Sequence, residues 1–554
     1  MIRLSEIKLT LAQAETQDAH LVTAAAGVLK VPPTDLAQVD VFKRSFDARK
    51  AELLVVFIVD VTLADPTREA GLLQQLAGNP HVAATPDMTW RPPVQAKAPP
   101  PLRPVVVGFG PCGIFAALVL AQMGLCPIVL ERGKPVRQRT KDTWGLWRKN
   151  VLNPESNVQF GEGGAGTFSD GKLYSQIKDP RHLGRKVMNE FVKAGAPPEI
   201  LYAAHPHIGT FKLVKVVENM REQIIALGGE VRFEQRVTDV LLHADNGTTS
   251  LRGLTVLNQA TGETSELRCD HAVLALGHSS RDTFAMLHER GVFMEAKPFS
   301  IGFRIEHPQS VIDRARWGRH AGHPMLGAAD YKLVHHASNG RSVYSFCMCP
   351  GGTVVAATSE VGRVVTNGMS QYSRNERNAN AGMVVGIFPQ DYPGGPLAGV
   401  ALQRRLESTA FELGGGTYEA PGQLVGDFIK GQASTALGSV EPSYKPGVKL
   451  GDLHQALPDY AIAALREALP AFGRKIKGFD MPDAVLTGVE TRTSSPLKMT
   501  RGEDYQSLNV RGLYPAGEGA SYAGGILSAG VDGIRVGEAV ALSLNQSPPP
   551  LGEG

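Results

Sequence analysis

Residues 104–133 contain a short apolar strand, a glycine-rich turn, an apolar helix and a second strand, and this segment constrains the fold most strongly. The first strand is Pro104–Val107, and Gly108, Gly110 and Gly113 follow it with the spacing G-x-G-x-x-G. In that pattern the first glycine permits a tight turn, the second lets the backbone approach a pyrophosphate, and the third lets helix and strand pack closely. The helix N-terminus adds free N–H groups for the phosphates. The segment therefore predicts a dinucleotide-binding site.

An acidic residue ends the second strand of this unit. The strand is Pro127–Leu130, and Glu131 follows it. Glu131 lies 18 residues after Gly113, close to the spacing of a carboxylate that accepts ribose hydroxyls. Arg132 comes next and is a candidate for phosphate contact, with a solvated side chain as the alternative. The complete pattern predicts a Rossmann-type domain, although it does not distinguish FAD from NAD.

A late glycine-rich segment, Leu513–Ala539, favours FAD. It contains a short strand, then Gly517 and Glu518, then a second glycine turn with Gly525 and Ile526 before a helix. In flavoproteins of the two-dinucleotide and hydroxylase-like classes, such a segment returns to the first Rossmann unit. Its acidic residue then approaches the pyrophosphate and ribitol, and its helix N-terminus points at the flavin. An NAD-only Rossmann enzyme needs no such return, so the segment disfavours that alternative.

Three further places are candidates for cofactor contact. Asn157–Leu173 is a glycine-rich loop able to wrap an extended ligand, with a flexible surface loop as the alternative. Val237 lies on a strand expected to pass the adenine, and Gly277 ends a buried strand that returns to the cofactor sheet. The predicted cofactor-binding residues are Gly108, Gly110, Pro111, Cys112, Gly113, Glu131, Arg132, Gly164, Gly166, Thr167, Ser169, Lys172, Val237, Gly277, Gly517, Glu518, Gly525 and Ile526.

The chain has 554 residues, too many for one ordinary core, so several domains are expected. The predicted fold class is α/β: a Rossmann-type FAD-binding domain, an antiparallel β-rich substrate-type domain and a small N-terminal α+β ferredoxin-like domain. The predicted boundaries are 1–91 for the ferredoxin-like domain, 92–104 for a Pro-rich linker, 105–289 with 482–545 for the discontinuous FAD-binding domain, 290–481 for the substrate-type domain, and 546–554 for a flexible tail.

Composition sets broad limits on partners and location. Hydrophobic residues make up 43% and charged residues 20%, as in globular proteins. The formal net charge of +3 is too small to indicate a nucleic-acid partner. The N-terminal residues lack the apolar core of a signal peptide, and no apolar run reaches the length of a membrane span. We expect a cytoplasmic protein with a small-molecule substrate and no membrane partner; the oligomeric state stays open.

Candidate catalytic residues are few. Arg492 lies in a polar stretch just before the cofactor-return segment and is a candidate for substrate anchoring or flavin contact, with an ion pair to Glu490 or another carboxylate as the alternative. His278 lies at the expected flavin mouth and is a candidate acid or base. Cys347 and Cys349 are two residues apart on a predicted strand, which puts both on one face. They are candidates for a redox pair or for buried inert thiols, and no metal site is predicted.

Several long strings extend the pattern through nearly the whole chain, among them VVVGFGPCGIFAAL, QFGEGGAGTFSDGKL, KPFSIGFRIEHPQ, CMCPGG, GVETRTSSPLK and YPAGEGASYAGGI. Together they resemble a large bacterial family of FAD-dependent proteins labelled NAD(FAD)-utilising dehydrogenases. The resemblance implies FAD, a Rossmann-type FAD domain and an oxidoreductase. It implies no substrate.

The leading hypothesis is an FAD-dependent oxidoreductase that transfers a hydride between an unidentified small organic substrate and flavin. NAD(P)H is a candidate transient co-substrate, although no second G-x-G-x-x-G occurs between residues 140 and 512 to indicate a separate nicotinamide domain. The alternative is a flavin-binding sensor or an RNA-associated protein that uses the N-terminal domain as a binding module.

Overall fold

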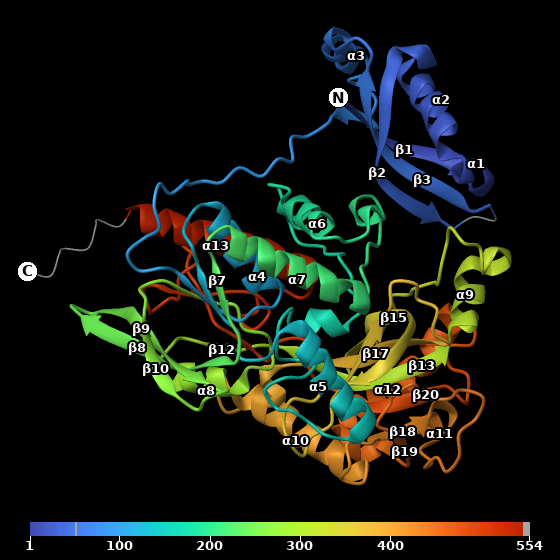
Figure 1. The fold of residues 1–554 in the computed structure, drawn as a ribbon. Coiled ribbons are helices and arrows are strands. Elements are labelled where there is room, and N and C mark those ends of the chain that lie inside the picture. Colours follow the sequence, from blue (N-terminus) through green and yellow to red (C-terminus); the bar gives the residue numbers. More distant parts are fainter. Residues whose placement is uncertain (50–51, 547–554) are drawn as a thin grey trace, which may run out of the picture.

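The computed structural model describes residues 1–49 and 52–546. Figure 1 shows a small blue N-terminal body, a mixed α/β body around α4 and α13, and a body built on a large sheet that contains β13, β15 and β20. The predicted flexible tail, apart from Gln546, lies outside the described residues. No helix in the described ranges is both long enough and apolar enough to span a membrane.

A five-stranded parallel sheet forms the centre of the α/β body. Its order is β22-β11-β5-β6-β7, and every neighbouring pair is parallel. Its central strands are fully buried because helices and a second small sheet cover its two faces. The strands are β5 (Val105–Val107), β6 (Ile128–Leu130), β7 (Glu230–Arg232), β11 (Ala272–Leu274) and β22 (Leu513–Pro515). The predicted Rossmann-type sheet is thus completed by a strand from the late segment.

Helices α4 (Pro111–Gln122) and α13 (Ile526–Gln546) pack directly against each other, as Figure 1 shows. Glycines on α13 make this contact possible, because a Cβ at Gly533 would lie 2.2 Å from the carbonyl oxygen of Cys112. The C-terminal helix therefore lies over the helix that follows the fingerprint. Two further helices join the same apolar cluster, α6 (Leu183–Lys193) and α7 (Thr210–Ala226).

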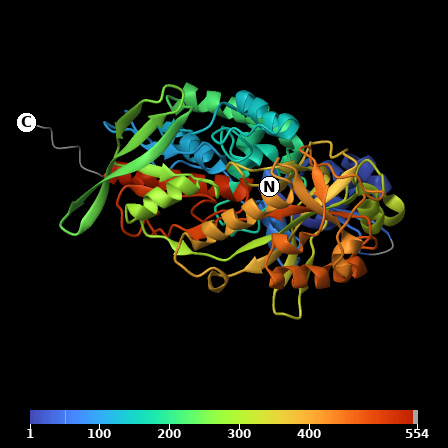
Figure 2. The ribbon, with the colours of Figure 1, turned by 90° about the horizontal axis from the view of Figure 1, so that it is seen from below.

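The opposite side of the parallel sheet carries a three-stranded antiparallel sheet of order β10-β9-β8 and helix α8 (Arg281–Glu289). Figure 2 shows the green strands of this small sheet at one end of the molecule and the orange elements of the large sheet at the other. The strands are β8 (Gln235–Asp245), β9 (Thr248–Asn258) and β10 (Thr264–Arg268).

The third body is built on an eight-stranded sheet of order β14-β15-β17-β13-β20-β18-β19, with β16 paired to β15. Neighbouring strands are antiparallel except β18 and β19. The strands are β13 (Phe299–Pro308), β14 (Val334–His336), β15 (Ser342–Ala356), β16 (Thr366–Ser370), β17 (Asn378–Ile387), β18 (Ala420–Leu424), β19 (Val448–Leu450) and β20 (Val485–Glu490). The predicted boundary after residue 481 comes too early, because β20 pairs with β13 and β18 inside this sheet.

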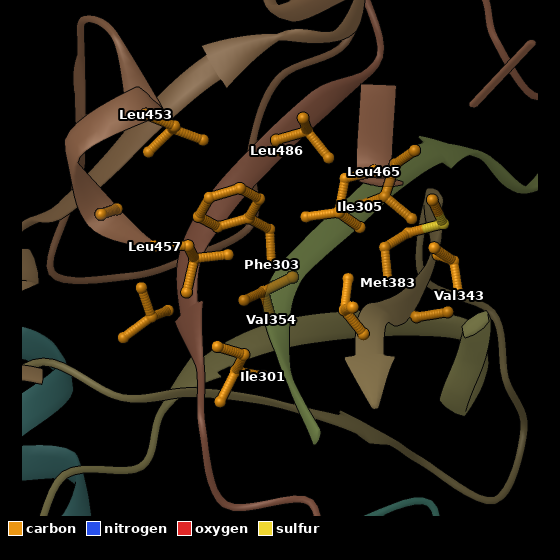
Figure 3. Close-up of a cluster of buried hydrophobic side chains, with 14 of the residues drawn as sticks. Ile301, Phe303, Ile305, Val343, Val354, Met383, Leu453, Leu457, Leu465 and Leu486 are labelled. Atoms are coloured by element: carbon orange, nitrogen blue, oxygen red, sulfur yellow. The ribbon is translucent and has the colours of Figure 1, made fainter. Parts of the chain in front are cut away.

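Side chains on the faces of this sheet form the largest apolar cluster. Figure 3 shows part of it, where Phe303, Ile305 and Leu486 from neighbouring strands lie beside Leu465 of α12 (Asp459–Lys475). Helices α10 (Ala398–Leu413) and α5 (Val136–Lys149) also contribute to it. The shorter elements around these bodies are α9 (Gln309–Trp317), α11 (Val425–Lys430), β12 (Glu295–Ala296) and β21 (Leu497–Lys498).

The N-terminal body has an antiparallel sheet of order β2-β3-β1-β4. Alternate residues of β3 are buried against the helices, as a half-covered sheet requires. The elements occur in the order β1 (Ile2–Thr10), α1 (Leu11–Glu15), α2 (Gln17–Leu29), β2 (Leu36–Asp47), β3 (Leu54–Leu63), α3 (Glu69–Gln75) and β4 (Val82–Ala84). Its assignment to the ferredoxin-like fold remains a prediction.

This body is docked on the other two. The edge strand β2 pairs with residues 202–204, since the N–H of Arg44 donates to the carbonyl of Tyr202 at 2.7 Å and Ala204 donates back to Arg44 at 2.9 Å. Phe46 also packs edge-on against Trp317 of α9. The predicted Pro-rich linker has no helix or strand. It is fastened to the α/β body, where the N–H of Ala96 donates to the carbonyl of Met123.

Candidate functional site

The turn between β5 and α4 is closed so tightly that side chains are excluded from it. Gly108 has a φ of 98°, and a Cβ there would lie 2.5 Å from the carbonyl oxygen of Ala275. A Cβ on Gly113 would lie 1.9 Å from the carbonyl oxygen of Gly108. Helix α4 begins at Pro111, directly after this turn, so its N-terminal N–H groups face the space above the sheet.

Glu131 ties this turn to the glycine-rich loop. Its carboxylate accepts N–H groups from Phe109 at 2.9 Å, Gly133 at 2.7 Å and Gly161 at 3.0 Å. A carboxylate has about four acceptor positions. The side chain also borders the cavity described below, which fits its predicted role toward a ribose. Sequence reasoning missed the backbone contacts because they join segments 30 residues apart.

A single cavity runs from the fingerprint turn to the large sheet. Val237 and Glu131 border it on the side of the α/β body, and Cys347 and Asn367 border it on the side of the large sheet. Of the predicted cofactor-binding residues, those that line it are Gly108, Gly110, Pro111, Cys112, Glu131, Arg132, Gly164, Gly166, Ser169, Lys172, Val237, Gly277, Glu518, Gly525 and Ile526.

Three predicted cofactor-binding residues do not line the cavity. Gly113 packs against the β5–α4 turn, and Gly517 donates its N–H to the Asp532 carboxylate at 2.8 Å. Thr167 is buried in the loop, and its hydroxyl has no hydrogen-bond partner among the described residues. Their roles are therefore in shaping the walls. Arg132 does border the cavity, but Glu155 and Asp282 hold its guanidinium at 3.0 and 2.8 Å.

The N-terminus of α13 opens onto the same cavity. Gly524, Gly525 and Ile526 line it there, and a Cβ on either glycine would meet no atom within 4 Å. A helix N-terminus carries a positive partial charge, so this open space suits a group that becomes anionic. The glycine turns, the carboxylate of Glu131 and this helix N-terminus together fit the phosphate, ribose and ring portions of FAD.

Arg492 lines the cavity and is held by an anion. Its guanidinium donates to Glu407 at 3.1 and 3.0 Å and to the hydroxyls of Ser279 and Ser359 at 3.0 and 2.7 Å. Of the two predicted alternatives, the ion pair is present, but its carboxylate is Glu407 of α10. Glu490 instead pairs with Arg304 at 2.6 Å.

Glu407 is shared by two buried arginines. Arg281 of α8 donates to it at 2.9 and 2.7 Å, opposite Arg492. Burial raises the pKa of the Glu407 carboxyl, but the attraction of Arg281 and Arg492 outweighs burial and holds that pKa well below its usual range. This network joins the α/β body to the large-sheet body, because Arg281 belongs to the first and Glu407 to the second.

Two titratable groups border the cavity near this network. Burial, followed by the positive charges of Arg492 and Arg281, lowers the pKa of His278 to about 3, so its imidazole is neutral at physiological pH. Burial raises the pKa of Glu518 to about 7, against the opposing effect of Lys297. Within the described ranges, no group of three or more His, Cys, Asp or Glu side chains is arranged to hold a metal ion.

Sequence reasoning missed several residues of the cavity wall. Asn367 comes from β16, Thr493 follows β20, Tyr174 follows the glycine-rich loop, and Arg236 lies on β8. Thr493 lies in the string GVETRTSSPLK beside Arg492, Arg236 precedes Val237, and Tyr174 follows the predicted loop, so each adjoins a predicted residue or segment. Only strand pairing brings Asn367 to the cavity, and no local pattern could have identified it.

The fold and cavity define a flavoprotein with a Rossmann-type FAD-binding domain. Residues 298–493 match the family model "FAD-dependent protein, C-terminal domain-like", and residues 1–62 match a domain of unknown function, DUF8436. An uncharacterised protein of Clostridium beijerinckii is 48% identical over 520 residues, covering 92% of this chain and 93% of that protein. The chain therefore belongs to this family of FAD-dependent proteins.

Solved structures similar to the chain are distant. A glycerol-3-phosphate dehydrogenase from Bacillus halodurans complexed with FAD is 12% identical, with a TM-score of 0.34, and the match covers 81% of this chain and 66% of that one, just under two thirds. A flavoprotein/dehydrogenase from Cytophaga hutchinsonii is 11% identical, with a TM-score of 0.34, covering 81% and 80%.

Proposed function

We propose that the chain is an FAD-dependent oxidoreductase that transfers a hydride between a small organic substrate and flavin. The continuous cavity carries this proposal, because one end is the dinucleotide fingerprint and the other is walled by the large sheet. A cavity shared by a cofactor body and a second body gives a substrate access to the cofactor's reactive end.

The chain's own groups divide the binding of FAD among them. The N–H groups at the start of α4 suit the pyrophosphate, Glu131 suits the ribose of the adenosine, and Val237 suits the adenine. The N-terminus of α13 suits the ring. When bound, FAD supplies the atom that accepts or donates the hydride.

In this proposal, Arg492 and His278 border the part of the cavity that holds the reactive end of the cofactor, and they have different roles. Most N–H groups of Arg492 are used by Glu407, Ser279 and Ser359, so its orientation is fixed. The guanidinium of Arg492 thus presents a positive charge to the substrate from a fixed position. The neutral His278 contributes hydrogen bonding without adding a second charge.

Glu518 is the group proposed to hold or release a proton. A carboxyl with a pKa of about 7 changes protonation near physiological pH, which suits general acid or base work. Lys297 opposes the effect of burial and keeps the pKa from rising further. Substrate oxidation and reduction both move a proton, and Glu518 borders the cavity where that proton would travel.

NAD(P)H is proposed as a transient co-substrate that enters the same cavity from its open end. The lack of a second fingerprint between residues 140 and 512 supports sequential use of one cavity over a dedicated nicotinamide domain. The N-terminal body has its edge strand paired to residues 202–204, which does not favour its use as a free RNA-binding module.

The visible absorption spectrum of the purified full-length chain tests this proposal, recorded before and after anaerobic addition of NADH and then NADPH. The proposal expects a flavin spectrum that bleaches with one of the two nucleotides. A flavin spectrum unaffected by either removes the nicotinamide co-substrate and directs the search to organic donors. A chain that stays colourless after incubation with FAD would refute the proposed function.

A further inference from the structure

We propose that Cys347 and Cys349 form a dithiol–disulfide pair that exchanges two electrons with the flavin bound in the cavity. This inference rests on the proposed function and adds an internal redox centre to it. The pair lies on β15, on the wall that the large sheet presents to the cavity.

The two cysteines hold different positions relative to the cavity. Cys347 lines it, and Cys349 is completely buried behind. The Sγ of Cys349 lies 3.4 Å from the carbonyl oxygen of Cys347 and donates to it. The Cys349 thiol therefore points toward the backbone of Cys347, and Cys347 faces the space proposed for the cofactor.

A local break in β15 produces this arrangement. Cys347 has a φ of 43°, in the left-handed region that residues other than glycine rarely adopt. The register between β15 and β17 shifts on both sides of Cys349, between Phe346 and Cys349 and again before Gly352. In a regular strand, residues two apart have Cα atoms about 6.6 Å apart, at the long end of the range that a disulfide bridges. The break curls the segment, which favours the shorter separation that a disulfide needs.

Two positively charged side chains contact this segment, and each has a carboxylate partner: Glu490 for Arg304, and Asp170, 4.0 Å away, for Lys172. Arg304, buried beneath it, donates to the carbonyl of Cys347 at 2.8 Å and pairs with Glu490. Lys172, from the glycine-rich loop, donates to the carbonyl of Met348 between the two cysteines. Charges of this sign stabilise a thiolate, which is the reactive form of cysteine.

The protonation of the pair agrees with this environment. The neighbouring Cys349 thiol lowers the pKa of Cys347, assisted by Arg304 and Lys172 and opposed by burial and by Asp170. The same contact and burial raise the pKa of Cys349. These directions mean that Cys347, which lines the cavity, ionises before Cys349. In contrast, burial raises the pKa of Cys112 and Cys269, as expected for packing thiols.

The space around Cys349 keeps its sulfur in place. A Cβ on Gly368 of β16 would lie 2.9 Å from this sulfur, and a Cβ on Gly352 would lie 3.2 Å from the Cys349 Cβ. The neighbouring strands are therefore as close to the thiol as glycine allows.

The proposed step is balanced. The Cys347 thiolate and the Cys349 thiol form one S–S bond, and the S–H bond of Cys349 breaks. Two electrons and that single proton pass to oxidised FAD, which becomes the anionic hydroquinone. The total charge is unchanged, and the reverse step reduces the disulfide with reduced flavin.

The test is a reductive titration of the FAD-loaded, full-length chain after oxidation with diamide and removal of the excess. The wild-type chain is expected to consume two equivalents of dithionite per flavin, one for the disulfide and one for the flavin. Cys349→Ser and Cys347→Ser are each expected to consume one equivalent. Cys126→Ser is the matched control and is expected to consume two, because Cys126 lies in the turn before β6, away from the cavity.

A second readout needs no flavin activity. Thiol alkylation and peptide mass analysis of the same samples are expected to show Cys347 and Cys349 in one peptide that is lighter by two hydrogens and unalkylated after oxidation, and doubly alkylated after reduction. One equivalent per flavin in the wild type, with both thiols alkylated after diamide, overturns the inference and leaves the flavoprotein proposal standing. A chain that binds no FAD overturns the proposed function and the electron exchange with it.

Discussion

Replacing Glu407 by glutamine tests whether the buried ion network holds the two large bodies together. The carboxylate accepts five hydrogen bonds, two from Arg281, two from Arg492 and one from the hydroxyl of Thr491 at 2.8 Å. The side chain of Glu407 is completely buried, and those of Arg281 and Arg492 are 1% and 3% exposed. Glutamine keeps one acceptor oxygen but turns an N–H₂ group toward guanidinium donors, and it leaves two buried cations without their shared anion.

The expected cost follows from this geometry. Removing one partner of a buried ion pair costs about 3–5 kcal/mol. With an m-value of at least roughly 3 kcal/mol per molar urea, since m rises with chain size, the unfolding midpoint should fall by at most about 1–1.7 M. Tryptophan fluorescence can follow the transition, because Trp147 is buried in the apolar cluster of the large-sheet body.

Glu441→Gln supplies the control for this experiment. It removes the same charge from the pair of Glu441 with Arg377, whose side chains are 73% and 61% exposed. Exposed pairs contribute about 0–1 kcal/mol, so its midpoint should barely move. If Glu407→Gln unfolds at the same urea concentration as Glu441→Gln, the reasoning about the buried network is refuted.

Four other substitutions test three separate expectations. Gly110→Ala should leave the fold intact but abolish FAD retention during gel filtration, because its Cβ meets Gly164 at an ordinary 3.5 Å and faces the pyrophosphate space. Gly113→Ala should instead lower the yield of folded protein. Equal FAD retention by Gly110→Ala and the wild type would contradict the fingerprint assignment. Burial lowers the pKa of His307 to about 4, so the unfolded chain binds more protons between pH 6.5 and 4, and stability should fall as the pH drops through that window by up to about 1.4 kcal/mol per pH unit. Urea midpoints of His307→Gln should show a shallower slope there, and an unchanged slope would count against it. A flavin absorbance change that titrates near pH 7 should be present in the wild type and absent in Glu518→Gln, and its persistence in the variant would assign it to another group.

Local sequence patterns predicted the parts of the fold that depend on residues close together in the chain. The β5–α4–β6 unit and its glycines follow from apolar runs and steric limits within about 30 residues. The late segment was also predictable, because its glycine turn and apolar helix form a second local pattern. The structure adds that α13 packs against α4 through Gly533.

Features that depend on distant partners were beyond sequence reasoning. The carboxylate that neutralises Arg492 lies 85 residues away in the chain, and nothing local marks Glu407 as its partner. The assignment of β20 to the large sheet depends on pairing with β13, nearly two hundred residues earlier. Cys347 adopts a left-handed conformation although it is not a glycine, so the sequence gives no sign of it. The two cysteines were therefore expected on an ordinary strand.

The late return of α13 to α4 has a consequence for synthesis of the protein. About 400 residues separate Gly113 from Gly525, so a ribosome working at roughly 5–20 residues per second needs on the order of a minute to pass between the two halves of the cofactor cavity. During that interval α4 lacks the helix that covers it, and its apolar side chains are open to other chains. The nascent protein should therefore depend on chaperones, and FAD should be captured only after Gly525 and the start of α13 have left the ribosome.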